Sequence, residues 1–250
     1  MRIVDAAAGR TLSRIYTEVL EPAFPPDELV SLEDLRRDVA SGTTQASAVL
    51  ADDGRILGAA VGDWSQSSRT MLLSYLAVTS DGRGTGIGTR LLATLVEQWR
   101  ERYQPCLILA EVEHPGYHAG NHAHGDPVAR LRFYGRHGAR VLDLPYFQPA
   151  LGPGLSRVSG MLLLALWVDP ELAGTGGADT VDASRLRTFL TEYLQESEGR
   201  VATDSQTAAL WRALDLPGGV PTWPVTEYAK VEVSQPTGWP RPDNRAPGSD

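Results

Sequence analysis

Residues 72–92 read LLSYLAVTSDGRGTGIGTRLL, and this stretch decides the fold. An apolar segment runs into a turn that holds Gly82, Gly84, Gly86 and Gly88, and a helix-forming segment begins within the turn. Glycines let a backbone approach a ligand closely and adopt positive φ. The free N–H groups and the dipole at a helix N-terminus favour a bound phosphate. The stretch therefore predicts a buried strand, a phosphate-binding loop and a helix, in that order.

The register of the glycines distinguishes between the known phosphate-binding loops. The dinucleotide motif G-x-G-x-x-G would need glycine at Ile87 or at Thr89, and a P-loop would need a Lys-Ser or Lys-Thr pair after the glycines. The pattern that fits is R-x-x-G-x-G, as Arg83, Gly86 and Gly88. The register therefore excludes a dinucleotide fingerprint and a nucleoside triphosphate loop.

With Leu76-Ala77-Val78 before it and Leu91-Leu92 after it, this motif resembles the acetyl-CoA loop of the GNAT N-acetyltransferase superfamily. The resemblance covers residues 1 to about 170. It implies that the strand before the loop splays from its neighbour, that the pantetheine arm inserts like an extra strand, and that loop N–H groups hold the pyrophosphate. A backbone N–H near Val78 would face the thioester carbonyl and stabilise the developing oxyanion. The cofactor-binding set that the resemblance implies is Leu76, Ala77, Val78, Arg83, Gly84, Thr85, Gly86, Ile87, Gly88 and Thr89.

Outward from the loop, residue periodicity predicts the order strand, helix, helix, three strands, helix, strand, helix, two strands. This order indicates an α/β (α+β mixed) chain with a central mixed sheet and helices on both faces. The resemblance implies the acyl-CoA N-acyltransferase fold, whose sheet is mostly antiparallel. The predicted strands are residues 2–4, 46–51, 56–64, 71–78, 105–113, 140–146 and 160–168, and the predicted helices are residues 12–20, 31–40, 86–102 and 127–137.

We expect three parts along the chain: an acyltransferase domain over residues 1–170, a helical extension over residues 171–234 and a disordered tail over residues 235–250. Residues 173–177 have the composition of a linker, and the tail is rich in proline, glycine and polar residues. Apolar stripes predict helices at residues 182–196 and 207–214 of the extension. Three roles stay open for the extension: covering the substrate site, forming a homodimer contact, or stabilising the core.

Acyl transfer to an amine requires a proton donor for the leaving thiolate. The segment RLRFYGRHGA, residues 130–139, resembles the family's helix that carries a tyrosine near the CoA sulfur, and that tyrosine maps onto Tyr134. A phenol with a pKa of about 10 suits this role. Packing in the core is the alternative role for this side chain. The chain departs from the family at Pro127, where many members carry an asparagine that contacts the cofactor.

The general base is sought on the next strand. In the run Leu107, Leu109, Glu111, Glu113 the period of two places both carboxylates on one face. Two neighbouring carboxylates in a cleft would raise one pKa towards neutrality, which suits a base. Glu111 ranks ahead of Glu113 because it lies deeper in the strand. The alternative for each carboxylate is that it lies at a solvated strand end. A water chain or a loop histidine also stays open as the base.

Four histidines, His114, His118, His122 and His124, fall in one loop. No cysteine joins them and glycines interrupt the loop, so we expect no metal site. Three interpretations of this loop stay open: its histidines line the acceptor pocket, one of them serves as the base, or it is a plain polar surface loop. Cys106 begins an apolar strand and is expected to be a buried core residue, which favours direct transfer in a ternary complex over an acyl-enzyme.

Composition limits the partners. The formal net charge of −8 disfavours nucleic acid. An acidic surface would mildly favour a cationic substrate, and solubility alone is the alternative role of the charge. The longest apolar run, residues 161–168, is too short to span a bilayer, the N-terminus lacks the apolar core of a signal peptide, and a single cysteine suits a reducing cytoplasm. We therefore expect a cytoplasmic N-acetyltransferase that uses acetyl-CoA and a small-molecule primary amine. A longer acyl-CoA, a non-catalytic acyl-CoA-binding module and a homodimer remain alternatives to test.

Overall fold

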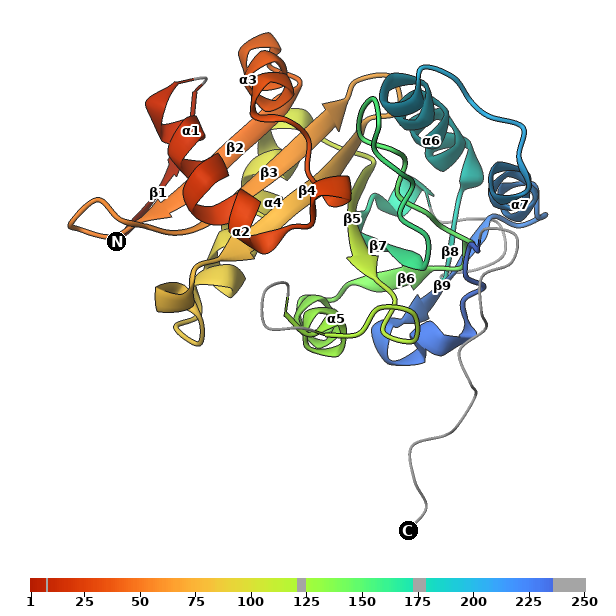
Figure 1. Cartoon of the computed structure of the whole chain (residues 1–250). Helices are drawn as coiled ribbons and strands as arrows, with labels where there is room; N and C mark the ends of the chain where they lie inside the picture. Colours follow the sequence, from red (N-terminus) through yellow and green to blue (C-terminus); the bar gives the residue numbers. More distant parts are fainter. Residues whose placement is uncertain (8, 121–124, 173–178, 236–250) are drawn as a thin grey trace.

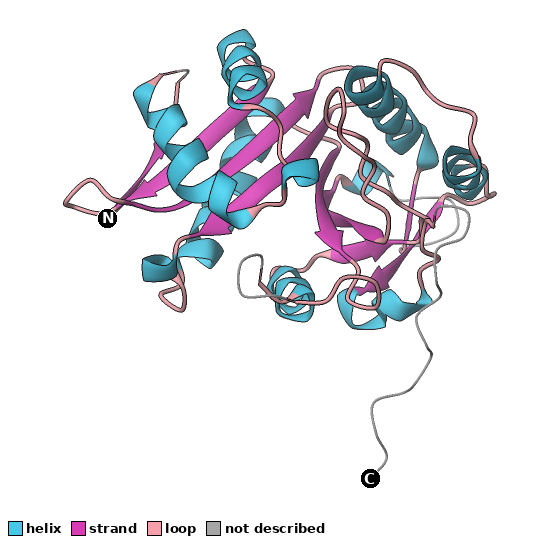
Figure 2. Ribbon diagram, viewed as in Figure 1, coloured by secondary structure: helices cyan, strands magenta, loops and turns pink. Residues whose placement is uncertain are grey.

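A computed structural model describes residues 1–7, 9–120, 125–172 and 179–235 of the chain. The predicted linker at residues 173–177 and residues 236–250 of the predicted tail lie outside the described residues. Figure 2 shows a mixed α/β architecture in which helices flank a twisted sheet. The strands are β1 (Arg2–Asp5), β2 (Thr44–Leu50), β3 (Ile56–Ser65), β4 (Thr70–Val78), β5 (Leu107–Glu113), β6 (Arg140–Leu142), β7 (Met161–Val168), β8 (Thr180–Val181) and β9 (Val220–Pro224).

The strands form one nine-stranded sheet in the order β1-β2-β3-β4-β5-β7-β6-β9-β8. The pair β4–β5 is parallel, and the other seven neighbouring pairs are antiparallel. The predicted mostly antiparallel sheet is therefore confirmed. The parallel pair needs a crossover connection, and the helix that follows the glycine loop provides it.

The helices cover both faces of the sheet, as predicted. They are α1 (Arg10–Ile15), the π-helical turn η1 (Tyr16–Leu20), α2 (Glu21–Ala23), α3 (Leu32–Ser41), α4 (Ile87–Tyr103), α5 (Pro127–Arg136), α6 (Ala183–Glu198) and α7 (Ser205–Leu214), with short 3-10 turns η2 (Pro26–Glu28), η3 (Ser80–Gly82), η4 (Pro170–Leu172) and η5 (Val225–Lys230). The first predicted helix runs three residues further than expected, to Ala23. Pro22 sits in the first turn of α2, where its missing N–H is tolerated.

Three apolar clusters place the helices on the sheet (Figure 1). The α1, η1 and α3 segments pack on β2, β3 and β4, and α4 and α5 pack on the opposite face. The helices α6 and α7 pack on β5, β6 and β7, on the face opposite α4 and α5. Strand alternation explains this division, because Leu72 belongs to the α6 side while Met71 and Leu73 belong to the α4 side.

The extension joins the sheet as well as covering it. Strand β9 pairs with β6, with Val141 opposite Trp223, and β8 pairs with β9. The sequence analysis predicted helices α6 and α7 but missed both strands, because segments of two and five residues show little periodicity. The extension is therefore continuous with the structure that carries the site, whereas its status as a separate unit stays a prediction.

A buried ion pair anchors the extension. Arg157 Nε lies 2.6 Å from Glu198 Oε1, and its Nη1 lies 2.9 Å from Asp204 Oδ2. The guanidinium also lies 4.3 Å from the ring centroid of Phe147. The side chains of Arg157 and Glu198 are only 15% and 12% exposed, so solvent screens their interaction weakly.

We expect Arg157→Gln to lower the free energy of unfolding by about 3 kcal/mol, because it leaves Glu198 buried without its cation. Arg37→Gln is the matched control, since Arg37 is 65% exposed and its ion pairs with Asp34 and Asp38 lie at the surface. That control is expected to change the free energy of unfolding by less than about 1 kcal/mol. Urea denaturation measures both, and equal losses would contradict a special anchoring role for Arg157.

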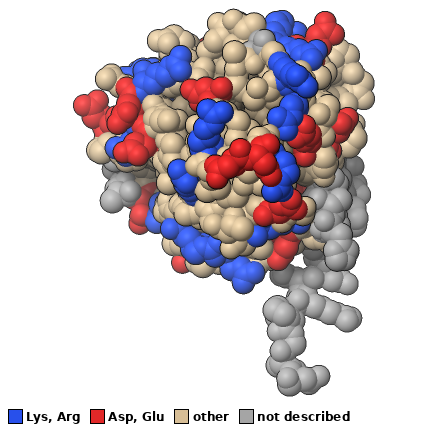
Figure 3. All heavy atoms as spheres, turned by 90° about the vertical axis from the view of Figure 1, so that its left-hand side faces the viewer, with Lys and Arg blue, Asp and Glu red and all other residues tan. Residues whose placement is uncertain are grey.

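The surface carries charge of both signs. Figure 3 shows acidic and basic side chains interspersed on the side of the molecule that carries β1, without one continuous basic area in that view. Within the described residues, no helix combines the length and the apolar character needed to cross a membrane.

Candidate functional site

The strands β4 and β5 separate halfway along their length (Figure 1). They pair from Thr70 opposite Leu107 to Leu73 opposite Ala110, and no further. Beyond that point β4 stays paired with β3 as far as Val78, and β5 stays paired with β7 as far as Glu113. Over this length the sides of β4 and β5 that face each other have no strand partner in the described part of the chain. The sheet is thus open at its centre.

An irregularity in β4 coincides with the opening. Val61 pairs with Tyr75 and Gly62 pairs with Leu73, so Ser74 is an extra residue in the strand. Such a bulge bends a strand and increases its twist. The Ser74 hydroxyl donates to the carboxylate of Asp63, which holds the bulge in place. The bulge therefore turns β4 away from β5 where their pairing ends.

The glycines of the loop after β4 have different physical roles. A Cβ on Gly82 would lie 2.6 Å from the Leu57 carbonyl oxygen, so only glycine packs there. Gly84 and Gly86 have φ of +74° and +81°, the left-handed region that glycine adopts without strain. No atom lies within 4 Å of a Cβ built on either residue, so open space adjoins both.

The helix α4 begins directly after Gly86. Its first hydrogen bond is donated by the N–H of Arg90 to the Gly86 carbonyl at 3.0 Å. The N–H groups of Ile87, Gly88 and Thr89 precede that bond and have no acceptor within the helix. Together with the helix dipole they form a positive end suited to phosphate oxygens. The residues of the predicted cofactor loop therefore fit a pyrophosphate.

Tyr134 lies on α5, on the same side of the sheet as α4. It is 5% exposed, and its ring meets that of Phe133 edge-on at 5.1 Å between centroids. Burial raises the pKa of the Tyr134 phenol to about 12, although the charge of Arg130 opposes the rise. The hydroxyl therefore stays protonated and can donate a hydrogen bond near neutral pH.

Glu111 lies on the opposite side of the sheet from Tyr134, on the face of β5 that α6 covers. Its Oε1 accepts a short hydrogen bond from the Tyr146 hydroxyl, and its Oε2 accepts one from Gln148 Nε2 at 3.2 Å. The Tyr193 hydroxyl lies 3.4 Å from Oε2 and 3.5 Å from Oε1. Burial raises the pKa of Glu111 to about 7, repulsion from Glu28 adds to the rise, and the three hydrogen bonds oppose it.

Glu113 has different partners, although it shares a strand face with Glu111 as expected. Its Oε2 lies 3.1 Å from Arg130 Nη1, and its Oε1 lies 3.5 Å from His118 Nδ1. The sequence analysis attributed a raised pKa to repulsion between Glu111 and Glu113. In the structure the largest cause for Glu111 is burial, and the repelling carboxylate is Glu28. Glu111 thus lies among hydroxyls and an amide, whereas Glu113 lies beside the Arg130 guanidinium and the His118 ring.

A groove of about 1030 Å³ opens above Glu111 between α3 and α6. We call it the α3–α6 groove. Its floor is formed by residues of β3, β4 and β5. Its lining contains six carboxylates and a single basic residue, Arg37. The carboxylates are Asp34 and Asp38 of α3, Asp63 of β3, Glu111 of β5, and Glu192 and Glu196 of α6.

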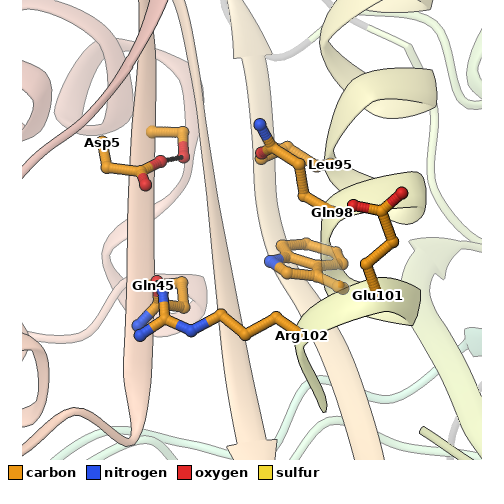
Figure 4. A pocket seen from close by; sticks show the side chains of 8 residues that line it. Asp5, Gln45, Leu95, Gln98, Glu101 and Arg102 are labelled. Atoms are coloured by element: carbon orange, nitrogen blue, oxygen red, sulfur yellow. Dashed lines mark hydrogen bonds between the residues drawn. The ribbon is translucent and has the colours of Figure 1, made fainter. Parts of the chain in front are cut away.

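A second cavity, of about 380 Å³, lies on the other face of the sheet (Figure 4). Its lining comes from β1, β2 and the C-terminal half of α4. Inside it, Ser47 Oγ donates to Asp5 at 2.9 Å and Arg102 Nη1 donates to Gln45 Oε1 at 3.1 Å. The elements that line this cavity include neither β5 nor the glycine loop, so it is separate from the candidate site.

The described part of the histidine loop is built around His114. This side chain is 5% exposed and lies between the rings of Tyr117 and Tyr228, at 5.0 and 5.1 Å between centroids. Burial lowers the pKa of His114 to about 4, so it is neutral at pH 7. His122 and His124 lie outside the described residues. No metal-binding group of three or more His, Cys, Asp or Glu side chains is found among the described residues.

Cys106 is 6% exposed, as expected for a core residue. Tyr146, Gln148 and Tyr193 were not predicted from the sequence as partners of Glu111. Tyr146 closes a predicted apolar strand and Tyr193 belongs to the apolar stripe of a predicted helix, so both had the pattern of core residues. The hydroxyl group of each tyrosine was the available signal for a polar partner in the core, because a buried tyrosine hydroxyl needs a hydrogen-bond partner.

Comparison with known proteins matches residues 44–138 to the family model of the acetyltransferase (GNAT) domain. A protein assigned to the GNAT acetyltransferase family from Bacteroides thetaiotaomicron has a TM-score of 0.55 and 23% identity, over 78% of this chain and 99% of that chain. A GNAT family acetyltransferase from Elizabethkingia anophelis with acetyl-CoA bound has a TM-score of 0.45 and 18% identity, over 66% of this chain and 95% of that chain. At 23% identity the likeness to the Bacteroides thetaiotaomicron protein concerns the fold alone. No curated protein matches the sequence at a significant level.

Proposed function

We propose that this chain, whose residues 44–138 match the family model of the GNAT acetyltransferase domain, transfers an acetyl group from acetyl-CoA to a primary amine of a small molecule. Transfer is direct, in a ternary complex. The observation that carries the proposal is Glu111, a partly buried carboxylate with a pKa of about 7, at the floor of an acidic groove. A base with a pKa near the operating pH is the most efficient proton acceptor.

Three features support acetyl-CoA as the donor. The N–H groups of residues 87–89 suit the pyrophosphate, and the space beside Gly84 and Gly86 admits it without a clash. The unpaired edge of β4, with Leu76, Ala77 and Val78, suits the amide groups of the pantetheine arm. When bound, acetyl-CoA supplies the acetyl group as an activated thioester.

The residues on the two sides of the sheet have complementary roles. Glu111 takes a proton from the substrate ammonium, so that the nitrogen lone pair is free to attack the thioester carbonyl carbon. The new C–N bond forms, the C–S bond breaks, and the nitrogen gives up its second proton, which replaces the proton that Tyr134 passes to the sulfur. The Tyr134 hydroxyl donates to the departing sulfur from the α5 side. A backbone N–H near Val78 stabilises the negative charge on the carbonyl oxygen. The opening between β4 and β5 connects the two sides.

We expect Tyr134→Phe to lower kcat about a hundredfold, because the thiolate loses its proton donor. Tyr103→Phe is the matched control, since the Tyr103 hydroxyl has no hydrogen-bond partner in the described structure and lies at the end of α4. The change in melting temperature on adding CoA should be the same in both variants as in the wild type. Equal kcat values in the two variants would exclude Tyr134 as the donor.

A mass-spectrometric screen of primary amines with acetyl-CoA tests the function itself. Acetylation of any amine, dependent on Glu111, would support the proposal. Two alternatives have distinct outcomes in the same screen. Acylation only with a longer acyl-CoA would identify a different donor, and binding of CoA without acylation of any amine would identify a binding module.

A further inference from the structure

We propose that the α3–α6 groove binds an acceptor with two positive charges, such as a linear diamine or polyamine. Glu111 and Gln148 receive the reacting nitrogen, while Glu192 and Glu196 of α6 bind a second ammonium group of the same molecule. The inference rests on the proposed function, because it concerns the acceptor of that reaction. It also assigns a role to the extension, which supplies one wall of the groove.

Gln148 provides the first observation. It lines the groove and is 5% exposed. Its Nε2 donates to Glu111 Oε2 at 3.2 Å, while its Oε1 is buried and receives no hydrogen bond from the described residues. A buried hydrogen-bond acceptor that lacks a donor lowers the stability of the protein. An ammonium or amine N–H beside Glu111 would satisfy this oxygen, whereas a molecule without N–H or O–H groups would not.

The second observation is that the groove carboxylates of α3 form ion pairs, whereas those of α6 do not within the described residues. Asp34 and Asp38 share Arg37, at 2.5 and 3.1 Å. In contrast, Glu192 and Glu196 form no ion pair within the described residues. Glu192 accepts hydrogen bonds from the hydroxyls of Ser65, at 2.8 Å, and Ser67. The α6 wall therefore retains uncompensated negative charge.

Repulsion within the groove supports the same conclusion. Burial raises the pKa of Glu196, and the charges of Glu192, Asp38 and Asp63 raise it further. Burial also raises the pKa of Asp63, which the hydroxyls of Ser74 and Thr44 oppose. Carboxylates from three elements thus repel one another across the groove. A bound cation reduces this repulsion, so a second ammonium group gains affinity that a monoamine lacks.

Helix α6 sets the distance between the two binding points. Tyr193 contacts Glu111, and Glu196 follows three residues later on the same helix face. Side chains at that spacing have Cβ atoms roughly 5–6 Å apart. The second ammonium group, at Glu196, is therefore bound about one helical turn from Tyr193, which contacts Glu111 and so lies beside the reacting nitrogen. This spacing suits two nitrogens joined by a short, flexible chain.

The test compares two amines of equal chain length, hexylamine and diaminohexane, in acetyl-transfer assays. In the wild type kcat/KM is expected to be about tenfold or more higher for the diamine, which corresponds to one modest charge interaction. In the double variant Glu192→Gln/Glu196→Gln, kcat/KM for the diamine should fall to the value for hexylamine. The matched control is Glu97→Gln/Glu101→Gln, an exposed pair with the same spacing on α4, which should keep the preference.

The outcomes separate this inference from the proposed function. Equal kcat/KM for both amines in the wild type would contradict the binding of a second ammonium group by Glu192 and Glu196. The proposed acetyltransferase activity would still stand. If neither amine is acetylated, calorimetric titration with diaminohexane tests the binding of the second ammonium group separately from the reaction. Binding that is lost in Glu192→Gln/Glu196→Gln would uphold it despite failure of the proposed reaction, and absence of binding to the wild type would overturn it as well.

Discussion

Glu111→Gln is expected to lower kcat for acetyl transfer about a thousandfold, because the amide cannot accept the proton of the substrate ammonium. The change keeps the shape of the side chain, and the amide oxygen still accepts a hydrogen bond from Tyr146 or Tyr193. The proposed CoA loop begins α4, which packs on the other face of the sheet, so the effect of CoA on the melting temperature should be retained. Kinetics at saturating amine and acetyl-CoA measure the loss.

The pH dependence of the wild type follows from the same carboxylate. The active form is the ionised one, and the pKa of Glu111 is raised to about 7. The carboxylate is therefore protonated and inactive well below pH 7, and kcat should rise as pH increases through about 7. This limb should disappear in Glu111→Gln. A wild-type limb near the ordinary glutamate pKa would contradict the environment described for Glu111.

Glu113→Gln is the matched comparison on the same strand. Its ion pair with Arg130 and its contact with His118 give it a positioning role at the strand end. We expect it to retain the pH limb near 7 and to lose much less activity than Glu111→Gln. The reverse ranking, with the larger loss in Glu113→Gln, would move the base to Glu113.

The second large effect is expected at the glycine loop. Gly86→Val should abolish the rise in melting temperature on adding CoA and weaken CoA binding at least about a hundredfold. Gly86 has φ of +81°, which a β-branched residue adopts only with strain. The new side chain would also occupy the open space at the start of α4, where the pyrophosphate is expected.

Gly199→Val is the control that separates backbone strain from an effect on CoA binding. Gly199 follows α6 with φ of +72°, and no atom lies within 4 Å of a Cβ built there. This variant carries the same kind of backbone strain and should keep the full response to CoA. An unchanged response in Gly86→Val would count against the loop as the cofactor site, and loss of the response in both variants would attribute it to destabilisation.

Local features of the site were predictable from consecutive residues. The glycine register, the strand before it and the beginning of the helix after it all lie within residues 72–92, so neighbouring residues encode the whole proposed loop. A helix was predicted from Ser31, and the hydroxyl of this residue accepts a hydrogen bond from the N–H of Asp34 at the start of that helix. Side-chain alternation placed Glu111 and Glu113 on one face. In each case the interacting groups are a few residues apart.

The tertiary structure alone decided the chemistry of the base and the shape of the acceptor side. Tyr146, Gln148 and Tyr193 lie 35, 37 and 82 residues from Glu111 in the chain, and no local pattern brings them together. A pKa depends on burial and on every charge nearby, and both are properties of the folded surroundings. The same holds for α6, which was predictable as a helix with an apolar stripe. That it forms a wall of the acidic groove opposite α3 depends on how the extension packs on β5, β6 and β7. The sequence by itself thus determined the proposed donor loop, because its groups are neighbours in the chain, and long-range packing determined the surroundings of the proposed base and the groove.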